Sequence, residues 1–472
     1  MVGRSSPGFG GLVFENPMPL FKDETLDVLA ERGNVAQFVS YRPYGSKLRQ
    51  SFSRIQGYSP NHSFSTPEEA VEALLKASSD RSVNVRSYVP DSPRSKEFVY
   101  GIKSRDEAIS TLHRLANSDL HLILNETIDV ADGGVSGVIQ GDVVEFAPDD
   151  TPRCVEKPGV ASLSFEVASA LLRTVYGVMP EIEARQTTRA EFSVHPVPRG
   201  YKGTHTILWE LETNVPGNPK PSFSWPNRFS RHIGDKAFGL LIAHLMGATV
   251  PHTLVIGRRV APFSFGTATS SGLVWTRTCP AEPQPGLYST YKGWVDPFKL
   301  VAKEDSGHSH LSSVLCQQGV SAAYSGAALV DSYGKLIVEG RSGEGDRFML
   351  GLTGPEMLPT NILSDVQQCY SSLSSKLGAI RFEWVHDGNH VWVVQLHRGA
   401  TNSDSDVIVP GNPARWVRVR AADGLDSLRV QLGDLPPEVG IIVEGNVGLT
   451  SHVADLLRKS KRPSKLAQPT LL

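Results

Sequence analysis

Glycine and proline interrupt this chain along its whole length, and that distribution constrains the fold more than any other feature. The 472 residues include 43 glycines and 32 prolines, spread without any low-complexity tract. Glycine readily adopts positive φ angles, and proline fixes φ and removes a backbone donor, so both residues favour turns. We therefore expect many short strands joined by turns, and not a bundle of long helices.

Four segments carry a helical pattern, in which a capping residue and early acids precede apolar residues spaced three or four apart. They begin at Thr66, Ser104, Val167 and Asp235. Between them lie β-rich segments such as HLILNETIDV, GDVVEF, HTILWELE, KLIVEG and HVWVVQL. This mixture predicts an α+β or mixed α/β fold with frequent antiparallel strands.

The composition narrows the classes of function. There are 47 basic and 49 acidic residues, a formal charge of −2, so no overall positive field favours nucleic acid. The four cysteines lie far apart without a CxxC pair, which argues against a disulfide framework and favours a reducing compartment. No apolar run approaches the roughly 20 residues of a membrane span, and the N-terminus has no signal-peptide core. We expect a cytoplasmic protein of about three domains, and the possibility of a homo-oligomer stays open.

Two loops predict the domain boundaries. Residues 214–232 are rich in proline and serine, and a second such segment, GATNSDSDVIVPGNPA, begins at Gly399. The predicted domains are therefore residues 1–230, 231–400 and 401–472.

A weak internal repeat links the first two of these domains. TRAEFSVHP with HTILWELE resembles IRFEWVHDG with HVWVVQLH. Upstream, DGGVSGVI parallels AAYSGAAL, and VSYRPYGSKLRQSFS parallels VWTRTCPAEPQPGLYST, in the same order. Two explanations stay open: duplication of one nucleotide-binding unit, or the general similarity of β-hairpins.

The strongest chemical signal is GIIVEGNVGLTSHVADLLRKSKRPSKL, which begins at Gly440. A buried β-type run leads into a glycine-rich turn, then into Thr450, Ser451 and His452, and then into an amphipathic stretch. This order places His452 at the first turn of a helix, where backbone N–H groups and the positive helix end hold phosphate oxygens. The two hydroxyls would be further donors to a phosphorylated histidine. The alternative is a helix start with no chemistry.

This segment resembles the phosphohistidine domain of phosphoenolpyruvate synthase, pyruvate phosphate dikinase and rifamycin phosphotransferase. The family pattern reads GGxTSHAAxxARxxGxPxxxG. The matching positions are Gly448, Thr450, Ser451, His452, Ala454, Arg458 and Pro463. The resemblance implies that His452 carries a phosphoryl group.

Residues 234–398 resemble the ATP-grasp nucleotide domain of the same family. GDKAFGLLIAHLMGATVPHTLVI is similar to GGKxxxLxxLxxxGxxVPxGFVI, VWTRTCPAEPQPGLYST to VRSSAxxEDxxxxSFAGxxxT, and RFEWVHDGNHVWVVQLHRG to xxIEWAxDxxxxxxLQxRP. The resemblance implies an ATP site formed by Lys236, Arg277, Glu282, Gln395 and Arg398, with Mg²⁺ on Glu383 and Gln395. The chemistry agrees, because cations neutralise a triphosphate and two oxygen ligands on adjacent strands can hold Mg²⁺ between phosphates.

A second candidate metal set lies in the first domain. LWELETNVPGNP resembles the E-x-N-x-x-PG element of ATP-grasp ligases such as D-alanine–D-alanine ligase, which implies Mg²⁺ ligation by Glu212 and Asn214, with Glu191 as a further acid. Arginines are dense in this domain and suit ATP phosphates or an anionic acceptor. They are Arg42, Arg49, Arg54, Arg86, Arg94 and Arg189. A second ATP site and a degenerate repeat without nucleotide both stay open.

Two weaker signals favour plain loops. RSGEGDRFMLG, from Arg341, suits a turn between strands as well as a phosphate loop. The histidines 308 and 310 lack a third metal ligand at a readable spacing, so a solvated loop is favoured over a metal site.

Three hypotheses follow. The first is an ATP-dependent phosphotransferase of the dikinase type, which passes a phosphoryl group through His452 to an unidentified small-molecule acceptor. The second is an ATP-grasp ligase that uses Glu191, Glu212 and Asn214 to form an acyl-phosphate and join it to an amine. The third is a catalytically silent ATP sensor or partner-binding protein. The predicted fold is a duplicated ATP-grasp arrangement with a short phosphohistidine-like domain at the C-terminus.

Overall fold

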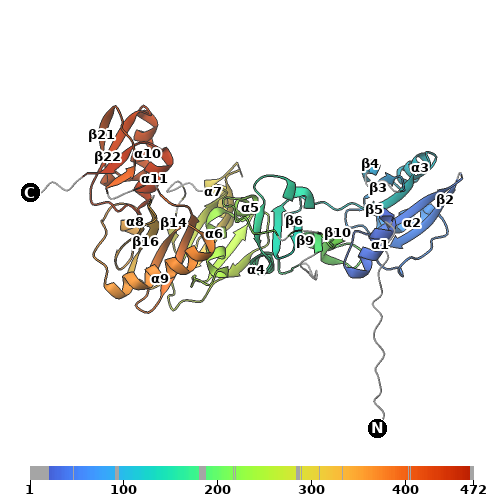
Figure 1. The fold of residues 1–472 in the computed structure, drawn as a ribbon, viewed down its shortest axis with the longest axis horizontal. Helices are drawn as coiled ribbons and strands as arrows, with labels where there is room; N and C mark the ends of the chain where they lie inside the picture. Colours follow the sequence, from blue (N-terminus) through green and yellow to red (C-terminus); the bar gives the residue numbers. More distant parts are fainter. Residues whose placement is uncertain are drawn as a thin grey trace, which may run out of the picture. The chain divides into compact units, whose positions relative to one another are not determined.

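The computed structural model describes residues 21–467, apart from positions 46, 91–94, 180–187, 216, 218, 283–287, 289, 308, 332, 402, 404 and 405. The chain forms two compact units, Met1–Asp129 with Val197–Glu210 and Val130–Pro196 with Leu211–Leu472. Both combine helices with largely antiparallel sheets (Figure 1), which confirms the mixed α/β class. The expected boundaries near residues 230 and 400 both lie inside the second unit.

The first unit is a five-stranded sheet with two helices packed on one face. The strand order is β2-β1-β5-β3-β4, and all its pairs are antiparallel. Thr66 and Ser104 cap α2 and α3 through their side chains, as their sequences predict. The apolar faces of both helices cover the alternate residues of the central strands that point to the core. The elements are α1 (Lys22–Arg32), β1 (Phe38–Tyr44), β2 (Lys47–Arg54), α2 (Pro67–Ala77), β3 (Val83–Tyr88), β4 (Ser95–Ile102), α3 (Arg105–Ala116) and β5 (His121–Glu126).

The second unit opens with a sheet in the order β10-β9-β6-β7-β8. Helix α4 follows β8, and Ser164 caps it by accepting from the Val167 N–H. The division between the two units falls within β9 and β10. The elements are β6 (Val135–Gln140), β7 (Val143–Pro148), η1 (Pro152–Glu156), β8 (Ala161–Ser164), α4 (Phe165–Tyr176), β9 (Thr188–Arg199) and β10 (Thr204–Thr213).

Three further sheets complete the second unit, in the orders β12-β11-β15-β13-β14, β17-β16-β18-β19 and β20-β23-β22-β21. The last of these contains the parallel pairs β21–β22 and β22–β23, with α10 and α11 in its core. The helices are α5 (Arg228–Ile233), α6 (Asp235–Leu245), α7 (Pro297–Glu304), α8 (Asp346–Met349), α9 (Thr360–Leu377), η2 (Ala421–Asp423), α10 (Gly424–Asp434) and α11 (His452–Ser460). The strands are β11 (Thr253–Gly257), β12 (Phe263–Phe265), β13 (Val274–Pro280), β14 (Thr290–Lys292), β15 (Leu311–Gln318), β16 (Tyr324–Val330), β17 (Leu336–Ser342), β18 (Ile380–His386), β19 (Val391–Arg398), β20 (Val407–Val409), β21 (Arg415–Arg420), β22 (Val439–Glu444) and β23 (Ser464–Leu466).

The internal repeat is visible in the topology of two sheets. In each, a hairpin (β6–β7 or β16–β17) precedes a long helix (α4 or α9) and a second hairpin (β9–β10 or β18–β19), and the first strands of the two hairpins pair. The first sheet has the additional strand β8 between β7 and α4. The registers agree as well, since Val138 pairs with Glu191 and Ala327 pairs with Glu383. Both acids stand opposite the residue that follows a Ser-Gly pair. Glu191 and Glu383 therefore occupy equivalent positions in two sheets of the same design.

Candidate functional site

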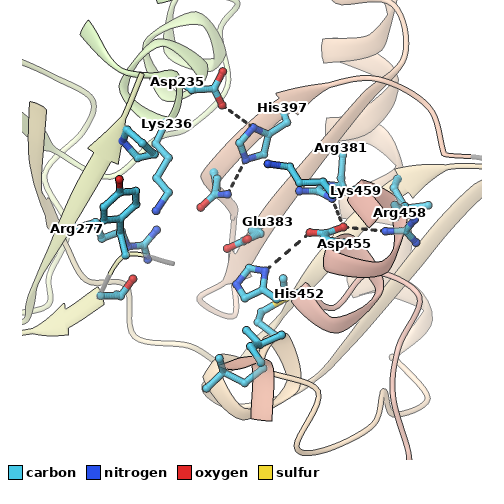
Figure 2. A pocket seen from close by; sticks show the side chains of 18 of the residues that line it. Asp235, Lys236, Arg277, Arg381, Glu383, His397, His452, Asp455, Arg458 and Lys459 are labelled. Atoms are coloured by element: carbon cyan, nitrogen blue, oxygen red, sulfur yellow. Dashed lines mark hydrogen bonds and ion pairs between the residues drawn. The ribbon is translucent and has the colours of Figure 1, made fainter. Parts of the chain in front are cut away.

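A cavity of about 770 Å³ in the second unit gathers most of the candidate residues. This volume is in the range of small-molecule and cofactor sites, roughly 300–1,000 Å³. Figure 2 shows its basic and acidic side chains converging from α6, β13, β18, β19 and α11. The candidates among its lining residues are Lys236, Arg277, Glu383, Gln395, Arg398 and His452.

Lys236 enters the cavity from the first turn of α6. Gly234, just before the helix, has φ +94°, and a Cβ there would lie 2.5 Å from the Cys279 sulfur. The glycine therefore allows α6 to begin in close contact with β13. The Lys236 ammonium lies 3.4 Å from the Thr278 carbonyl oxygen, and burial lowers its pKa. A half-buried ammonium whose one hydrogen bond to a described residue is long is available to an anionic ligand.

Arg277 lies beside Lys236, on β13. One Nη donates to the Val394 carbonyl oxygen at 3.4 Å, while its Nε is buried and has no hydrogen-bond partner among the described residues. Burial also lowers the pKa of this guanidinium. Leaving a charged donor unpaired is costly, so the site gains when an anion accepts from it.

Glu383 and Gln395 are direct cross-strand partners on β18 and β19, and a register shift follows immediately after them. Both line the cavity, together with Asp346 from α8, whose pKa is raised by burial and by Glu344. Among the described residues, no group of three or more His, Cys, Asp or Glu side chains is arranged to hold a metal alone. One carboxylate and one amide oxygen still fit Mg²⁺ bound to a nucleotide, because that ion takes most of its ligands from phosphates and water.

His452 is the first residue of α11 and lines the same cavity. Its Nδ1 lies 3.9 Å from Asp455 Oδ2, one turn further along the helix. Asp455 is buried and also pairs with Arg381 of β18 and with Arg458, at 2.8 Å for the latter. Burial alone would raise the pKa of Asp455, but Arg381, His452 and Arg458 outweigh it and hold that pKa well below its ordinary value. The carboxylate is therefore ionised beside the imidazole.

Thr450 and Ser451 hold the helix start in place instead of lining the cavity. The Thr450 N–H and hydroxyl both donate to Glu339 Oε2, at 2.9 and 2.8 Å, and the Leu449 N–H donates to Oε1 at 3.1 Å. The Ser451 hydroxyl donates to the Gly448 carbonyl oxygen and accepts from the Ala454 N–H. The sequence suggested both hydroxyls as donors to phosphate. In the structure the Thr450 hydroxyl donates to the Glu339 carboxylate of β17, and the Ser451 hydroxyl takes part in the cap of α11.

Three other candidates lie in different surroundings. Glu282 pairs with Arg231 at 3.1 Å, is exposed, and does not line the cavity. Arg398 does line it, but its guanidinium lies over the Phe223 ring and donates to the Phe223 carbonyl oxygen. Arg42 is in the first unit, on β1, where it pairs with Glu24 at 3.0 Å.

Glu191 and Glu212 lie near one another, as the second candidate set requires, but an arginine joins them. Arg189 is 2.7 Å from Glu191 and 3.7 Å from Glu212. Asn214 follows β10 with φ +63°. The cluster therefore contains its own cation, and in this arrangement it offers less to a metal ion than Glu383 and Gln395 do.

Of the remaining sequence signals, the segment from Arg341 reaches the cavity through Asp346 and Met349 of α8, whereas the arginines of the first unit do not line it. Arg54 pairs with Asp27 at 2.8 Å, and the Arg86 guanidinium lies over the Phe98 ring. Arg94 and His308 lie outside the described residues. In the part of the chain that the structure describes, no helix is long and apolar enough to cross a membrane.

Sequence reasoning missed several polar residues of the cavity. Arg381, Asp455 and Lys459 all line it, as do Asp235 and His397. A signal existed for Arg381, which stands two positions before Glu383 and so shares its face of β18. Asp455 and Lys459 lie three and seven positions after His452, on the same side of a helix.

Comparisons with known proteins give limited information. No family model matches the chain, and no curated protein matches it. Among solved structures it is similar to D-alanine–D-alanine ligase from Helicobacter pylori, with 12% identity, 36% of this chain and 53% of that chain covered, and a TM-score of 0.24. An L-amino acid ligase from Bacillus licheniformis gives 14% identity, 39% and 43% coverage and a TM-score of 0.23. D-alanine–D-alanine ligase from Bacillus anthracis complexed with ATP gives 15% identity, 36% and 55% coverage and a TM-score of 0.22.

The chain thus spans about half the length of the structures it matches. Likeness at these TM-scores does not assign a fold or an activity. The resemblance to the phosphoenolpyruvate synthase family stays a prediction, and the functional argument depends on the cavity.

Proposed function

We propose that this protein is an ATP-dependent phosphotransferase in which His452 receives a phosphoryl group and passes it to a small-molecule acceptor. The observation that carries the proposal is a single cavity that contains His452 together with Lys236, Arg277, Glu383 and Gln395. These residues come from distant parts of the chain and supply a nucleophile, two phosphate-binding cations and two oxygen ligands for Mg²⁺.

Catalysis in this proposal consists mainly of positioning and neutralisation of charge. Lys236 and Arg277 are both half-buried, and among the described residues each makes one long hydrogen bond of 3.4 Å, so they are available to hold the phosphate oxygens of ATP. Glu383 and Gln395 hold Mg²⁺, which when bound neutralises the charge that develops on those oxygens. An ATP-grasp-like clamp is the corresponding fold-level proposal, with a short phosphohistidine-like domain at residues 401–472.

The histidine step needs a ring nitrogen with a free lone pair, and Asp455 favours the tautomer of His452 in which Nε2 has one. The Asp455 carboxylate faces Nδ1 of His452, which favours a proton on that nitrogen and leaves the Nε2 lone pair to attack. The Nε2–P bond forms as the P–O bond to the nucleotide breaks, with the electron pair going to the nucleotide oxygen. The positive charge that develops on the ring is then stabilised by Asp455. In the second step the acceptor's nucleophile takes the phosphoryl group, and the ring returns to its neutral form.

The test is to incubate the full chain with Mg²⁺ and ATP labelled at either the β or the γ phosphate, and to measure acid-labile label on the protein. We expect label on the wild type and none on His452→Gln. The matched control is His390→Gln, because His390 also lies 3.9 Å from an aspartate, Asp387, yet it does not line the cavity. ATP binding without label on any variant would rule out the histidine step and leave the ligase and the silent sensor.

A ligase is the second candidate function, and one observation favours it. Glu191 occupies the same register position as Glu383, and Glu212 lies near it on β10. A ligase would release ADP only when an acid and an amine are both present, and Glu191→Gln would abolish that release. His452→Gln would leave it intact, so the two functions separate cleanly.

A further inference from the structure

The turn that precedes His452 is bound to one side chain of the neighbouring sheet. Glu339, on β17, accepts three hydrogen bonds from this turn: two from Thr450, through its N–H and its hydroxyl, and one from the Leu449 N–H. Thr450 and Leu449 are 1% and 5% exposed, so these donors have little access to water. Gly448 allows the close contact, because a Cβ there would lie 2.5 Å from Glu339 Oε2.

Glu339 stands in the same cross-strand row of that sheet as the candidate metal ligands. Ala327 of β16 pairs with Glu339 on one side and with Glu383 on the other, and Glu383 pairs with Gln395. Directly paired residues of antiparallel strands point to the same face, so Glu339 and Glu383 share a face, with the methyl group of Ala327 between them. Adjacent strands lie about 4.8 Å apart, which puts the two backbone positions roughly 10 Å from one another.

This row connects the proposed nucleophile to the candidate metal ligands through hydrogen-bonded strands. One end of it holds the turn before His452, and the other end carries Glu383 and Gln395. Figure 2 shows the His452 imidazole and the Glu383 carboxylate facing the same space. We propose that Glu339 is a positioning residue that fixes His452 at its distance from Glu383 and Gln395. This rests on the proposed function, which gives His452 the phosphoryl group and the other two residues the metal ion.

Glu339→Gln is the sharpest variant, because it keeps the shape of the side chain and removes one acceptor. When the amide oxygen accepts from Thr450, the amide N–H₂ faces the Leu449 N–H, and two donors oppose each other. The turn should therefore shift, and a misplacement of about 1 Å can lower a rate about 100-fold. We expect the initial rate of His452 labelling at saturating ATP to fall about 100-fold, with the Kd for ATP unchanged.

A second variant, Thr450→Val, leaves Glu339 in place and removes the hydroxyl that donates to it. We expect the labelling rate to fall about tenfold, because one hydrogen bond to a carboxylate is lost. Thr450→Ser keeps a hydroxyl and should restore most of the rate. The matched control is Glu356→Gln: Glu356 Oε2 likewise accepts from the N–H and the hydroxyl of one residue, at 3.0 and 2.9 Å, but that residue is Ser342 of β17.

A second readout does not depend on phosphoryl transfer. Mn²⁺ with a non-hydrolysable ATP analogue broadens the nuclear magnetic resonance signals of nearby histidine rings, and the broadening falls steeply with distance. The full chain is labelled on its histidines, and His452 is assigned by comparison with His452→Gln. We expect strong broadening of His452 in the wild type and in Glu356→Gln, and loss of most of it in Glu339→Gln. A loss of stability alone would leave the broadening in the folded protein unchanged.

Equal broadening of His452 in the wild type and in Glu339→Gln would overturn the proposal, as would a wild type in which the His452 signals stay sharp. A raised Kd for ATP with an unchanged labelling rate at saturation would also overturn it, because Glu339 would then act on nucleotide binding. If the broadening behaves as expected while no label reaches His452, the positioning role stands and the phosphotransferase fails.

Discussion

Two strands in this protein carry the same Arg-x-Glu pattern, and the arginine has a different partner in each. On β9, Arg189 lies 2.7 Å from Glu191 and also reaches Glu212. On β18, Arg381 stands at the equivalent position, two residues before Glu383, but it pairs with Asp455 of α11. Among the described residues, Glu383 forms no ion pair of its own and instead lines the cavity.

The difference shows what the C-terminal helix contributes to the site. Asp455 is buried and draws Arg381 away from Glu383, so that carboxylate is left available to a cation. In the sheet that contains β9, the partners of Arg189 among the described residues are Glu191 and Glu212, so these acids neutralise the arginine locally. One pattern therefore yields a closed ion-pair cluster in one sheet and a candidate metal ligand in the other.

The largest expected effect comes from removing the two equivalent carboxylates in turn. If Glu383 holds the metal, Glu383→Gln lowers ATP-dependent phosphorylation of the chain by about 100-fold or more, as losing a key electrostatic contact does. Glu191→Gln should leave it nearly unchanged, because Arg189 already neutralises that carboxylate. The initial rate of labelling at saturating ATP measures the effect of each variant. Equal losses in the two variants would contradict the proposed difference between the two glutamates.

Asp455→Asn tests whether the C-terminal helix keeps Arg381 away from Glu383. Breaking a buried ion pair by removing one partner costs about 3–5 kcal/mol, so unfolding by urea should begin at a lower concentration. Arg381 should then turn toward Glu383 and raise the Kd for Mn²⁺ in the presence of ATP about tenfold. The double variant Asp455→Asn with Arg381→Gln should recover most of that Mn²⁺ affinity; a double variant that binds as poorly as Asp455→Asn would contradict the idea.

The same carboxylate gives a pH dependence whose sign follows from its lowered pKa. Asp455 has a lower pKa in the folded chain than the value of about 3.9 in the unfolded chain. It therefore adds stability that is complete above about pH 5 and is lost as the pH falls through 4 and below. We expect the difference in unfolding free energy between wild type and Asp455→Asn to be constant from pH 5 to 7 and to shrink in more acidic buffer. A difference that grew toward acid would refute the assignment.

Arg189→Gln should have the smallest effect. Its ion pairs lie near the surface, with Glu212 about half exposed, and such pairs contribute roughly 0–1 kcal/mol. Thermal unfolding should therefore change little. Arg189→Gln should not create a metal site. If this variant bound Mn²⁺ at Glu191 and Glu212 as tightly as the wild-type cavity does, the two sheets would not differ in their capacity to bind a metal ion.

Much of the local structure could be predicted from sequence. The four helical segments appear as α2, α3, α4 and α6, and the β-rich segments appear as strands, because capping residues and side-chain periodicity act over a few neighbouring residues. The repeat was also readable, since TRAEF and IRFEW stand at equivalent register positions.

The sequence was less informative about the surroundings of the candidate side chains. It suggested Thr450 and Ser451 as phosphate donors, whereas Glu339, 111 residues before Thr450, accepts from the first of them. It drew attention to Arg398 and passed over His397, although only the latter contacts Asp235 and Gln395. A hydroxyl or imidazole offers the same donors wherever it stands, so its role depends on the partner that the fold supplies.

By itself, the sequence determined much of the local structure of this protein and pointed to candidate residues, including a histidine at a helix start and two Arg-x-Glu strands. Only the tertiary structure decided which of the two glutamates faces a cavity. Alternation along a strand puts arginine and glutamate on one face in both sheets, so local rules favour the same ion pair twice. The outcome differs because Asp455, 74 residues from Arg381 in the chain, lies buried beside one of the arginines. The fold has already buried the Asp455 carboxylate, and leaving such a charge unpaired would be costly, whereas water can still solvate the partly exposed Glu383.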